Sequence, residues 1–149
     1  MKRAVIYYSK TGNTKSVVEQ LVGFDNLRVI PESDNPSTTK PVIKVSPSVT
    51  DYERIIFASP VHGFQLSRVM QTYLAQCDDL ENKTVDLFVT HQFPFAWLGG
   101  NQTLKQMKKL VEKKKGKVRY MTSVNWSSKK RTSAIDEMIN LYNKNVESD

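Results

Sequence analysis

Short apolar runs alternate with helical stripes along the chain, and this alternation constrains the fold more than any other feature of the sequence. Strands covered on both faces read as nearly unbroken apolar runs, and such runs lie at residues 4–8, 55–58 and 85–89. Two strands of mixed polarity are predicted at residues 27–30 and 118–122. Apolar positions at helical spacing predict helices at residues 14–22, 66–77, 104–111 and 135–142. This order of elements favours an α/β fold with a parallel sheet and helices on both faces.

The polarity of the strands predicts their order in the sheet. The apolar strands belong in the centre, whereas the strands that carry Arg28 and Arg119 belong at the edges. Numbered along the chain, five strands then take the order 2-1-3-4-5, a doubly wound arrangement with its crevice between the first and third strands. Repeated prolines in residues 31–50 exclude a long helix there and leave a short extended piece at 42–45. A chain of 149 residues predicts a single domain, residues 1–149.

The composition excludes several classes of protein. A lone cysteine, Cys77, excludes an intramolecular disulfide framework, and the two histidines leave little for a metal site. No apolar run approaches the ~18 residues that a membrane-spanning helix needs. We therefore expect a soluble, cytoplasmic monomer without a membrane partner. Cys77 lies on the apolar stripe of a predicted helix, and we interpret it as a buried, inert thiol.

The net charge of +7 resides in the last third of the chain. Residues 1–100 hold 10 basic and 10 acidic side chains, whereas residues 101–149 hold 12 basic and 5 acidic ones. The run Lys129-Lys130-Arg131 follows the last strand on the side where ligands bind, which suits an acidic partner protein. Lysines within residues 108–117 end a helix, where they favour its dipole. Nucleic acid is not expected as a partner, because no aromatic stacking platform accompanies the lysines.

In a doubly wound sheet, ligands bind at the carboxyl ends of the strands, which predicts a site among the loops at residues 9–14, 59–65 and 90–100. The first loop, Ser9-Lys10-Thr11-Gly12-Asn13-Thr14, combines hydroxyl groups with a glycine between a strand and a helix. Backbone amides at the start of that helix and the hydroxyls of Ser9, Thr11 and Thr14 suit a phosphate group, and Gly12 lets the backbone approach it. The alternative is an ordinary N-cap run with a threonine or asparagine as the cap.

The first loop resembles the phosphate loop of the flavodoxins, which has the form Ser/Thr-x-Thr-Gly-x-Thr after the first strand. Residues 9–14 match that form at every fixed position, and the order of elements is similar over nearly the whole chain. The resemblance implies a flavodoxin-like fold and noncovalent binding of FMN, with the phosphate on residues 9–14.

The resemblance also implies where the flavin ring lies. One side of the ring would be lined by residues of the second loop, namely Ser59, Pro60, Val61, His62 and Gly63. Backbone groups near His62 and Gly63 would be the partners of the flavin N5 atom. The third loop would reach the pyrimidine edge with Thr90, His91, Gln92 and Phe93, and would bring Trp97, Gly99 and Gly100 nearby. The aromatic residue that stacks on the ring stays open among His62, Phe64, Phe93, Phe95 and Trp97.

The charge around the predicted site departs from the acidic surround implied by the resemblance. Residues 9–15, 59–68 and 90–101 contain no Asp or Glu, but do contain Lys10, Lys15 and Arg68. Because an acidic surround repels an anionic reduced flavin, we predict a less negative potential for the second one-electron reduction than is usual in the family.

The resemblance implies an electron carrier. The favoured function is transfer of single electrons between redox partner proteins. The alternative is a small FMN-dependent oxidoreductase acting on a quinone or porphyrin-type molecule, and a third possibility is a flavin-free binding module. Turnover of a small acceptor with NAD(P)H alone separates the first two functions.

Overall fold

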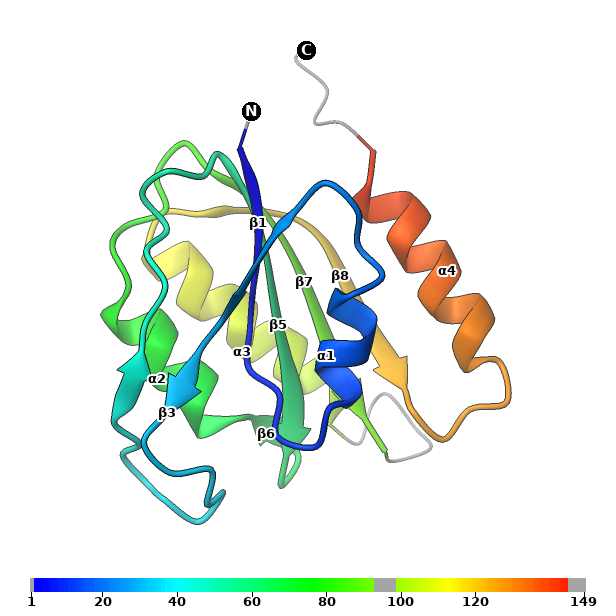
Figure 1. Ribbon diagram of the computed structural model, residues 1–149, viewed down its shortest axis with the longest axis horizontal. Coiled ribbons are helices and arrows are strands. Elements are labelled where there is room, and N and C mark those ends of the chain that lie inside the picture. The colour runs from blue at the N-terminus through cyan, green and yellow to red at the C-terminus, as the bar shows by residue number, and fades with distance from the viewer. Residues whose placement is uncertain (1, 93–98, 145–149) are drawn as a thin grey trace.

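The computed structural model describes residues 2–92 and 99–144, and its main sheet has the predicted order (Figure 1). The parallel strands lie side by side in the order β2 (Asp25–Arg28), β1 (Arg3–Tyr7), β5 (Arg54–His62), β7 (Thr84–His91) and β8 (Lys117–Asn125). The short strand β6 (Gln65–Leu66) pairs antiparallel with the end of β5. The prediction of a doubly wound sheet with the strands of Arg28 and Arg119 at its edges is confirmed.

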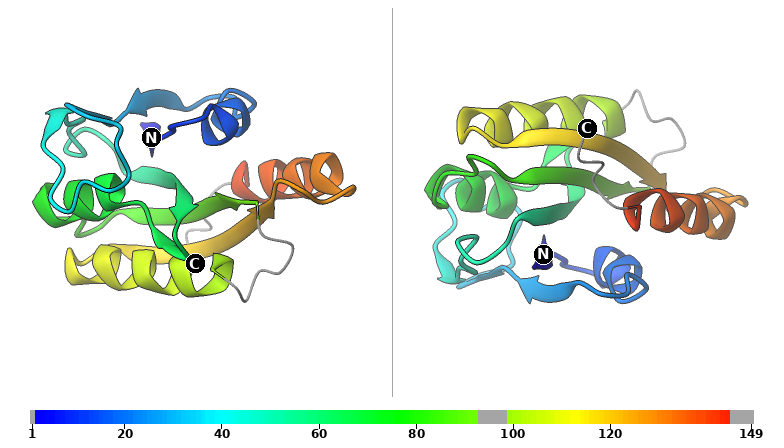
Figure 2. Two further views of the ribbon diagram at one scale, coloured as in Figure 1. Left: turned by 90° about the horizontal axis from the view of Figure 1, so that it is seen from below. Right: turned by 90° about the horizontal axis from the view of Figure 1, so that it is seen from above.

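Two helices cover each face of the sheet (Figure 2). Helices α1 (Asn13–Val18) and α4 (Arg131–Tyr142) pack on one face, and α2 (Arg68–Gln76) and α3 (Gly100–Lys113) pack on the other. Successive residues of β1 point to opposite faces, so Val5 belongs to the α1/α4 core and Ile6 to the α2/α3 core. Among the described residues, none of the helices has the length and apolar character needed to cross a membrane.

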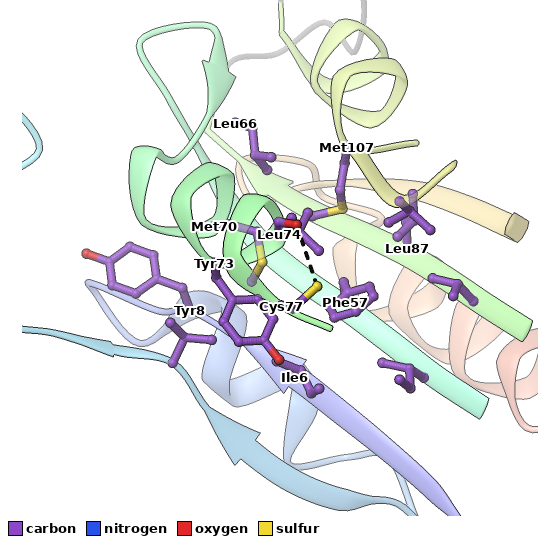
Figure 3. Close-up of a cluster of buried hydrophobic side chains, with 14 of the residues drawn as sticks. Ile6, Tyr8, Phe57, Leu66, Met70, Tyr73, Leu74, Cys77, Leu87 and Met107 are labelled. Carbon is purple, nitrogen blue, oxygen red and sulfur yellow. Dashed lines mark hydrogen bonds between the residues drawn. The ribbon is translucent and has the colours of Figure 1, made fainter. Parts of the chain in front are cut away.

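The α2/α3 core joins the central strands to two helices (Figure 3). Phe57 and Leu87 project from the sheet against Met70 and Leu74 of α2, and all four side chains are fully buried. Burial of each such side chain contributes roughly 1.5–3 kcal/mol. Cys77 caps the end of α2 inside this core, as predicted for an inert thiol, and burial raises the pKa of its thiol. The core therefore fixes the strands whose carboxyl ends carry the candidate site.

Two helices differ from their predicted bounds. Helix α1 ends at Val18 instead of continuing to residue 22, because the N–H groups of Gln20 and Leu21 bond to carbonyl oxygens three residues back and tighten the chain. The prediction that Val22 faces the core is wrong, since this side chain is 78% exposed. Helix α2 begins at Arg68 because the Ser67 hydroxyl accepts the N–H of Met70 and caps the first turn.

An irregular segment replaces a crossover helix between β2 and β5. It contains a two-stranded antiparallel ladder of β3 (Ile30–Pro31) and β4 (Ile43–Val45), which confirms the extended piece expected at residues 42–45. The Tyr73 hydroxyl of α2 donates a hydrogen bond to the carbonyl oxygen of Pro47 and ties the segment to the helix. The chain between β3 and β4 turns at the end of the molecule where β5 leads into β6 (Figure 1).

A buried carboxylate lies near the amino end of the central strand β7. Asp86 of β7 is fully buried and binds the Arg119 guanidinium with both oxygens, at 3.0 and 2.7 Å. Its Oδ2 atom also lies 3.5 Å from Nη2 of Arg54, another buried residue, and its Oδ1 accepts the N–H of Tyr120. Arg119 thus faces a buried acid as well as marking the edge of the sheet. The pairing explains how a charged residue occupies a central strand.

Candidate functional site

The loop after β1 folds around one buried hydroxyl group. The Oγ atom of Ser9 accepts hydrogen bonds from the N–H groups of Gly12 and Lys15, each at 3.2 Å. Gly12 has a φ of 97°, in the left-handed region that favours glycine, and nothing lies within 4 Å of the position a Cβ atom would take. The backbone at Gly12 is therefore open to a ligand.

Several amide groups of this loop remain available. The N–H groups of Thr11, Asn13 and Thr14 have no hydrogen-bond acceptor among the described residues. Helix α1 has Gly12 as its N-cap residue and no side-chain cap, so the alternative of a threonine or asparagine cap is wrong. The hydroxyls of Thr14 and Thr90 lie 3.0 Å apart, which joins this loop to the end of β7.

The second predicted loop is mostly strand. Residues 59–62 continue β5, because Ser59 and Pro60 stay in register with Val89 and Thr90 of β7. The prediction that a loop begins at residue 59 is therefore wrong. The chain then turns at Gly63 and Phe64, whose φ angles of 56° and 65° match the two-residue turn that suits the twist of a hairpin. This turn places His62 and Gly63 at the carboxyl end of β5.

The three predicted loops meet around one hollow of about 350 Å³, within the range of small-molecule sites. The predicted residues that line it are Thr11, Asn13, Pro60, Val61, His62, Gly63, Thr90, His91 and Gln92. Pro36 from the irregular segment completes the wall and was missed, because nothing in the sequence shows where that segment folds. None of the described residues that line the hollow is acidic.

Other predicted residues support the hollow without lining it. The hydroxyl of Ser59 is buried and lies 2.7 Å from that of Ser67. Ser9, Lys10, Gly12 and Thr14 belong to the loop beside the hollow. Gly99 and Gly100 allow close packing, since a Cβ atom would lie 3.3 Å from Val61 Cγ1 and 2.2 Å from Ser123 Oγ, respectively. Phe93 and Trp97 lie outside the described residues.

Of the two described candidates for stacking, His62 and Phe64, His62 is the one that lines the hollow. Its ring meets the Tyr8 ring edge-on, with the centroids 6.2 Å apart, and the Tyr8 hydroxyl donates to Asp34. Burial, and to a lesser extent the positive charge of Lys10, lower the pKa of His62 below its ordinary value of 6.5. The imidazole is therefore neutral at pH 7, and presents one N–H donor and one nitrogen acceptor.

A doubly wound parallel sheet with a hollow at the carboxyl ends of its strands defines an α/β protein of the flavodoxin-like fold class. Residues 4–137 match the family profile described as a flavodoxin domain. The chain belongs to the flavodoxin family, as its first loop predicted. No protein in a search of the curated proteins matches it.

Solved structures share this fold at low sequence identity. A flavoprotein in complex with FMN from Lactobacillus acidophilus is 17% identical with a TM-score of 0.65, covering 91% of this chain and 97% of its own. Oxidised flavodoxin 2 from Bacillus cereus is 13% identical with a TM-score of 0.68, covering 95% and 97%. An NADPH-quinone reductase from P. pentosaceus is 13% identical with a TM-score of 0.64, covering 99% and 100%. At such identities the likeness concerns the fold alone.

The donor groups at the hollow fit FMN. Available amides at residues 11, 13 and 14, together with the exposed Thr11 hydroxyl, offer uncharged donors to a phosphate at one end. Pro60, Val61 and the His62 ring offer flat apolar surface to a flavin ring along the other wall. The open space in front of Gly12 leaves room for the phosphate to reach the backbone.

Proposed function

We propose that the protein binds FMN noncovalently in the hollow between the loops after β1, β5 and β7. One observation carries this proposal: three segments far apart in the sequence bring available amides and apolar surface around a single hollow. Each hydrogen bond to a charged phosphate contributes roughly 1.5–3 kcal/mol, so the amides and the Thr11 hydroxyl suffice for tight binding. FMN, when bound, supplies transfer of one or two electrons.

Residues of this chain would then have separate roles. The loop of residues 9–14 holds the phosphate, with Ser9 and Thr14 fixing the loop from within through their buried hydroxyls. His62 and the backbone of Gly63 face the ring from the hairpin turn, whereas Thr90, His91 and Gln92 supply groups to its other edge. Phe93 and Trp97 remain part of the proposal from the family resemblance.

We further propose that the protein carries single electrons between partner proteins. Membership of the flavodoxin family supports this function. Lys129 and Lys130 are exposed where β8 leads into α4, at the same end of the sheet as the hollow, and they suit an acidic partner.

FMN titration tests the cofactor proposal directly. FMN-free protein should quench the fluorescence of added FMN with one equivalent bound, and Thr11→Val should weaken the binding about tenfold by removing a donor to the phosphate. Thr50→Val, at an exposed position before the amino end of β5, serves as the control and should leave the affinity unchanged. Protein that binds no FMN at micromolar concentration overturns the proposal.

A small FMN-dependent oxidoreductase is the second candidate function. A further hollow beside His62 favours it, because an enzyme needs room for a substrate next to the cofactor. Steady turnover of a quinone with NAD(P)H and the FMN-loaded protein alone would favour the enzyme, whereas a carrier should show almost none.

A further inference from the structure

A second hollow of about 230 Å³ adjoins the proposed ring site at His62. The two hollows share Pro36, His62 and Gly63 in their walls. The remaining lining residues of the second hollow are Ser37, Gln65, Leu66 and Arg68. Ser37 belongs to the irregular segment, Gln65 and Leu66 form β6, and Arg68 is the first residue of α2; none of the four is acidic.

Arg68 supplies the permanent positive charge of this hollow. Its side chain is half-buried, and one guanidinium nitrogen donates to the carbonyl oxygen of Ser37 at 3.3 Å. Among the described residues, no carboxylate lies within ion-pair distance of Arg68. Asp34 lines a small neighbouring pocket together with Arg68 and His62, but the hydrogen bond that it accepts comes from the Tyr8 hydroxyl. Most of the guanidinium donors of Arg68 are thus left for a ligand.

We propose that the second hollow is a subsite for the carboxylate group of a small planar molecule, which Arg68 holds beside His62. Binding at this subsite needs only the chain itself. Its purpose, to place such a molecule next to the flavin, rests on the proposed FMN site.

The charges around the hollow favour a carboxylate over a dianionic phosphate. A planar guanidinium pairs with the two oxygens of a carboxylate through parallel hydrogen bonds. Arg68 is the one cation among the described lining residues, which matches a single negative charge. His62, held neutral by its surroundings, can donate one N–H without adding charge.

The shape of the hollow favours a small planar molecule. Pro36, Gly63 and Leu66 present flat or apolar surface, and a volume of about 230 Å³ suits a group of roughly one aromatic ring. Gly63 brings backbone into the wall without a side chain, and nothing lies within 4 Å of its Cβ position.

An NMR titration of the FMN-free protein with benzoate tests the subsite. The amide signals of Ser37, Gly63 and Gln65 should shift together in a saturable way, and benzamide, its uncharged counterpart, should bind at least about tenfold more weakly. Arg68→Gln should abolish the shifts. Lys40→Gln removes an exposed positive charge from the same irregular segment and should leave them unchanged. Inorganic phosphate in place of benzoate should produce smaller shifts at the same concentration.

Three results would overturn the subsite: no saturable shift with benzoate, equal binding of benzamide, or equal loss of binding in Arg68→Gln and Lys40→Gln. A stronger response to phosphate than to benzoate would reject the carboxylate as ligand. FMN is then added to each protein in a separate titration. If benzoate binds and FMN does not, the proposed cofactor is rejected and the subsite is kept. If FMN binds and benzoate does not, the subsite is rejected and the proposed cofactor is kept.

Discussion

The hydroxyl groups of Thr14 and Thr90 lie 3.0 Å apart in the interior, so the loop that begins α1 is bonded to the end of the central strand β7. Both side chains are buried, with exposed fractions of 1% for Thr14 and 4% for Thr90. If the contact were broken, solvent water could not easily replace the lost hydrogen-bond partner of either hydroxyl. The bond joins two of the loops that form the hollow. The geometry of the proposed phosphate end therefore depends on the position of β7.

Thr90→Val should destabilise the protein by about 1–3 kcal/mol, because it leaves the buried Thr14 hydroxyl without its partner at almost unchanged volume. Urea unfolding followed by circular dichroism measures the change. Thr11→Val, at an exposed hydroxyl of the same loop, is the matched control and should stay within about 0.5 kcal/mol of the parent. Equal effects of the two substitutions would show that the Thr14–Thr90 contact does not stabilise the loop.

Asp86→Asn should lower the free energy of unfolding by about 3–5 kcal/mol. The substitution leaves Arg54 buried beside Arg119 without the negative charge that both guanidinium groups face. Asp136→Asn neutralises an exposed carboxylate of α4 and should change stability by less than about 0.5 kcal/mol. A loss below 1 kcal/mol for Asp86→Asn would mean that the buried pairs do not matter.

His62 should make stability depend on pH below neutrality. Its pKa is lower in the folded protein than the ordinary value of 6.5, so the unfolded chain binds more protons between the two values. The free energy of unfolding should therefore fall as the pH drops from 7.5 through 6.5 toward the folded pKa of His62. His62→Gln should flatten this part of the profile, and the difference between parent and variant removes the contribution of other titrating groups. A parallel pair of profiles contradicts the expectation.

The proposed flavin should be easier to reduce to its anionic form than is usual for the family. Lys10 lies beside the hollow in a loop region free of acidic residues, and it already lowers the pKa of His62. Each 1.4 kcal/mol of changed electrostatic interaction moves a one-electron couple by roughly 60 mV. Lys10→Glu should make the second reduction potential more negative, whereas Lys40→Glu should change it less. Equal second reduction potentials in the parent and Lys10→Glu proteins would show that the charge of Lys10 does not affect reduction of the flavin.

The order of the strands in the sheet was predictable because a strand that is buried on both faces has a nearly unbroken run of apolar residues. The apolar runs around Ile6, Phe57 and Phe88 indicated central strands, and Arg28 and Arg119, which interrupt the two strands of mixed polarity, indicated the edges. The ends of the strands were less predictable. Ser59 is polar and Pro60 favours turns, yet pairing with β7 keeps both residues in strand β5. At these two residues the pairing of neighbouring strands outweighs the intrinsic preference of the residues for turns.

The candidate site was predictable where sequence neighbours form it. The loop at residues 9–14 and the residues around His62 meet as expected. Arg68 was predicted only as a positive charge near the site, and Pro36 was beyond prediction, because it reaches the site through the irregular segment, whose placement depends on tertiary packing. Asp86 was visible as the lone polar residue of the apolar run at residues 85–89, but its two arginine partners come from neighbouring strands.

The antiparallel ladder of β3 and β4 has a consequence for motion. A crossover helix would protect its amides with a continuous row of internal bonds, whereas this segment relies on a short ladder and on scattered ties such as Arg68 to Ser37 and Tyr73 to Pro47. Regions held in this way open at low cost, ahead of global unfolding. Amide hydrogens of residues 32–42 should therefore exchange with deuterium earlier than those of β1 or β5. The irregular segment, which forms one wall of both hollows, would then open locally while the sheet stays folded. Small molecules could enter the hollows in this way without disturbing the sheet.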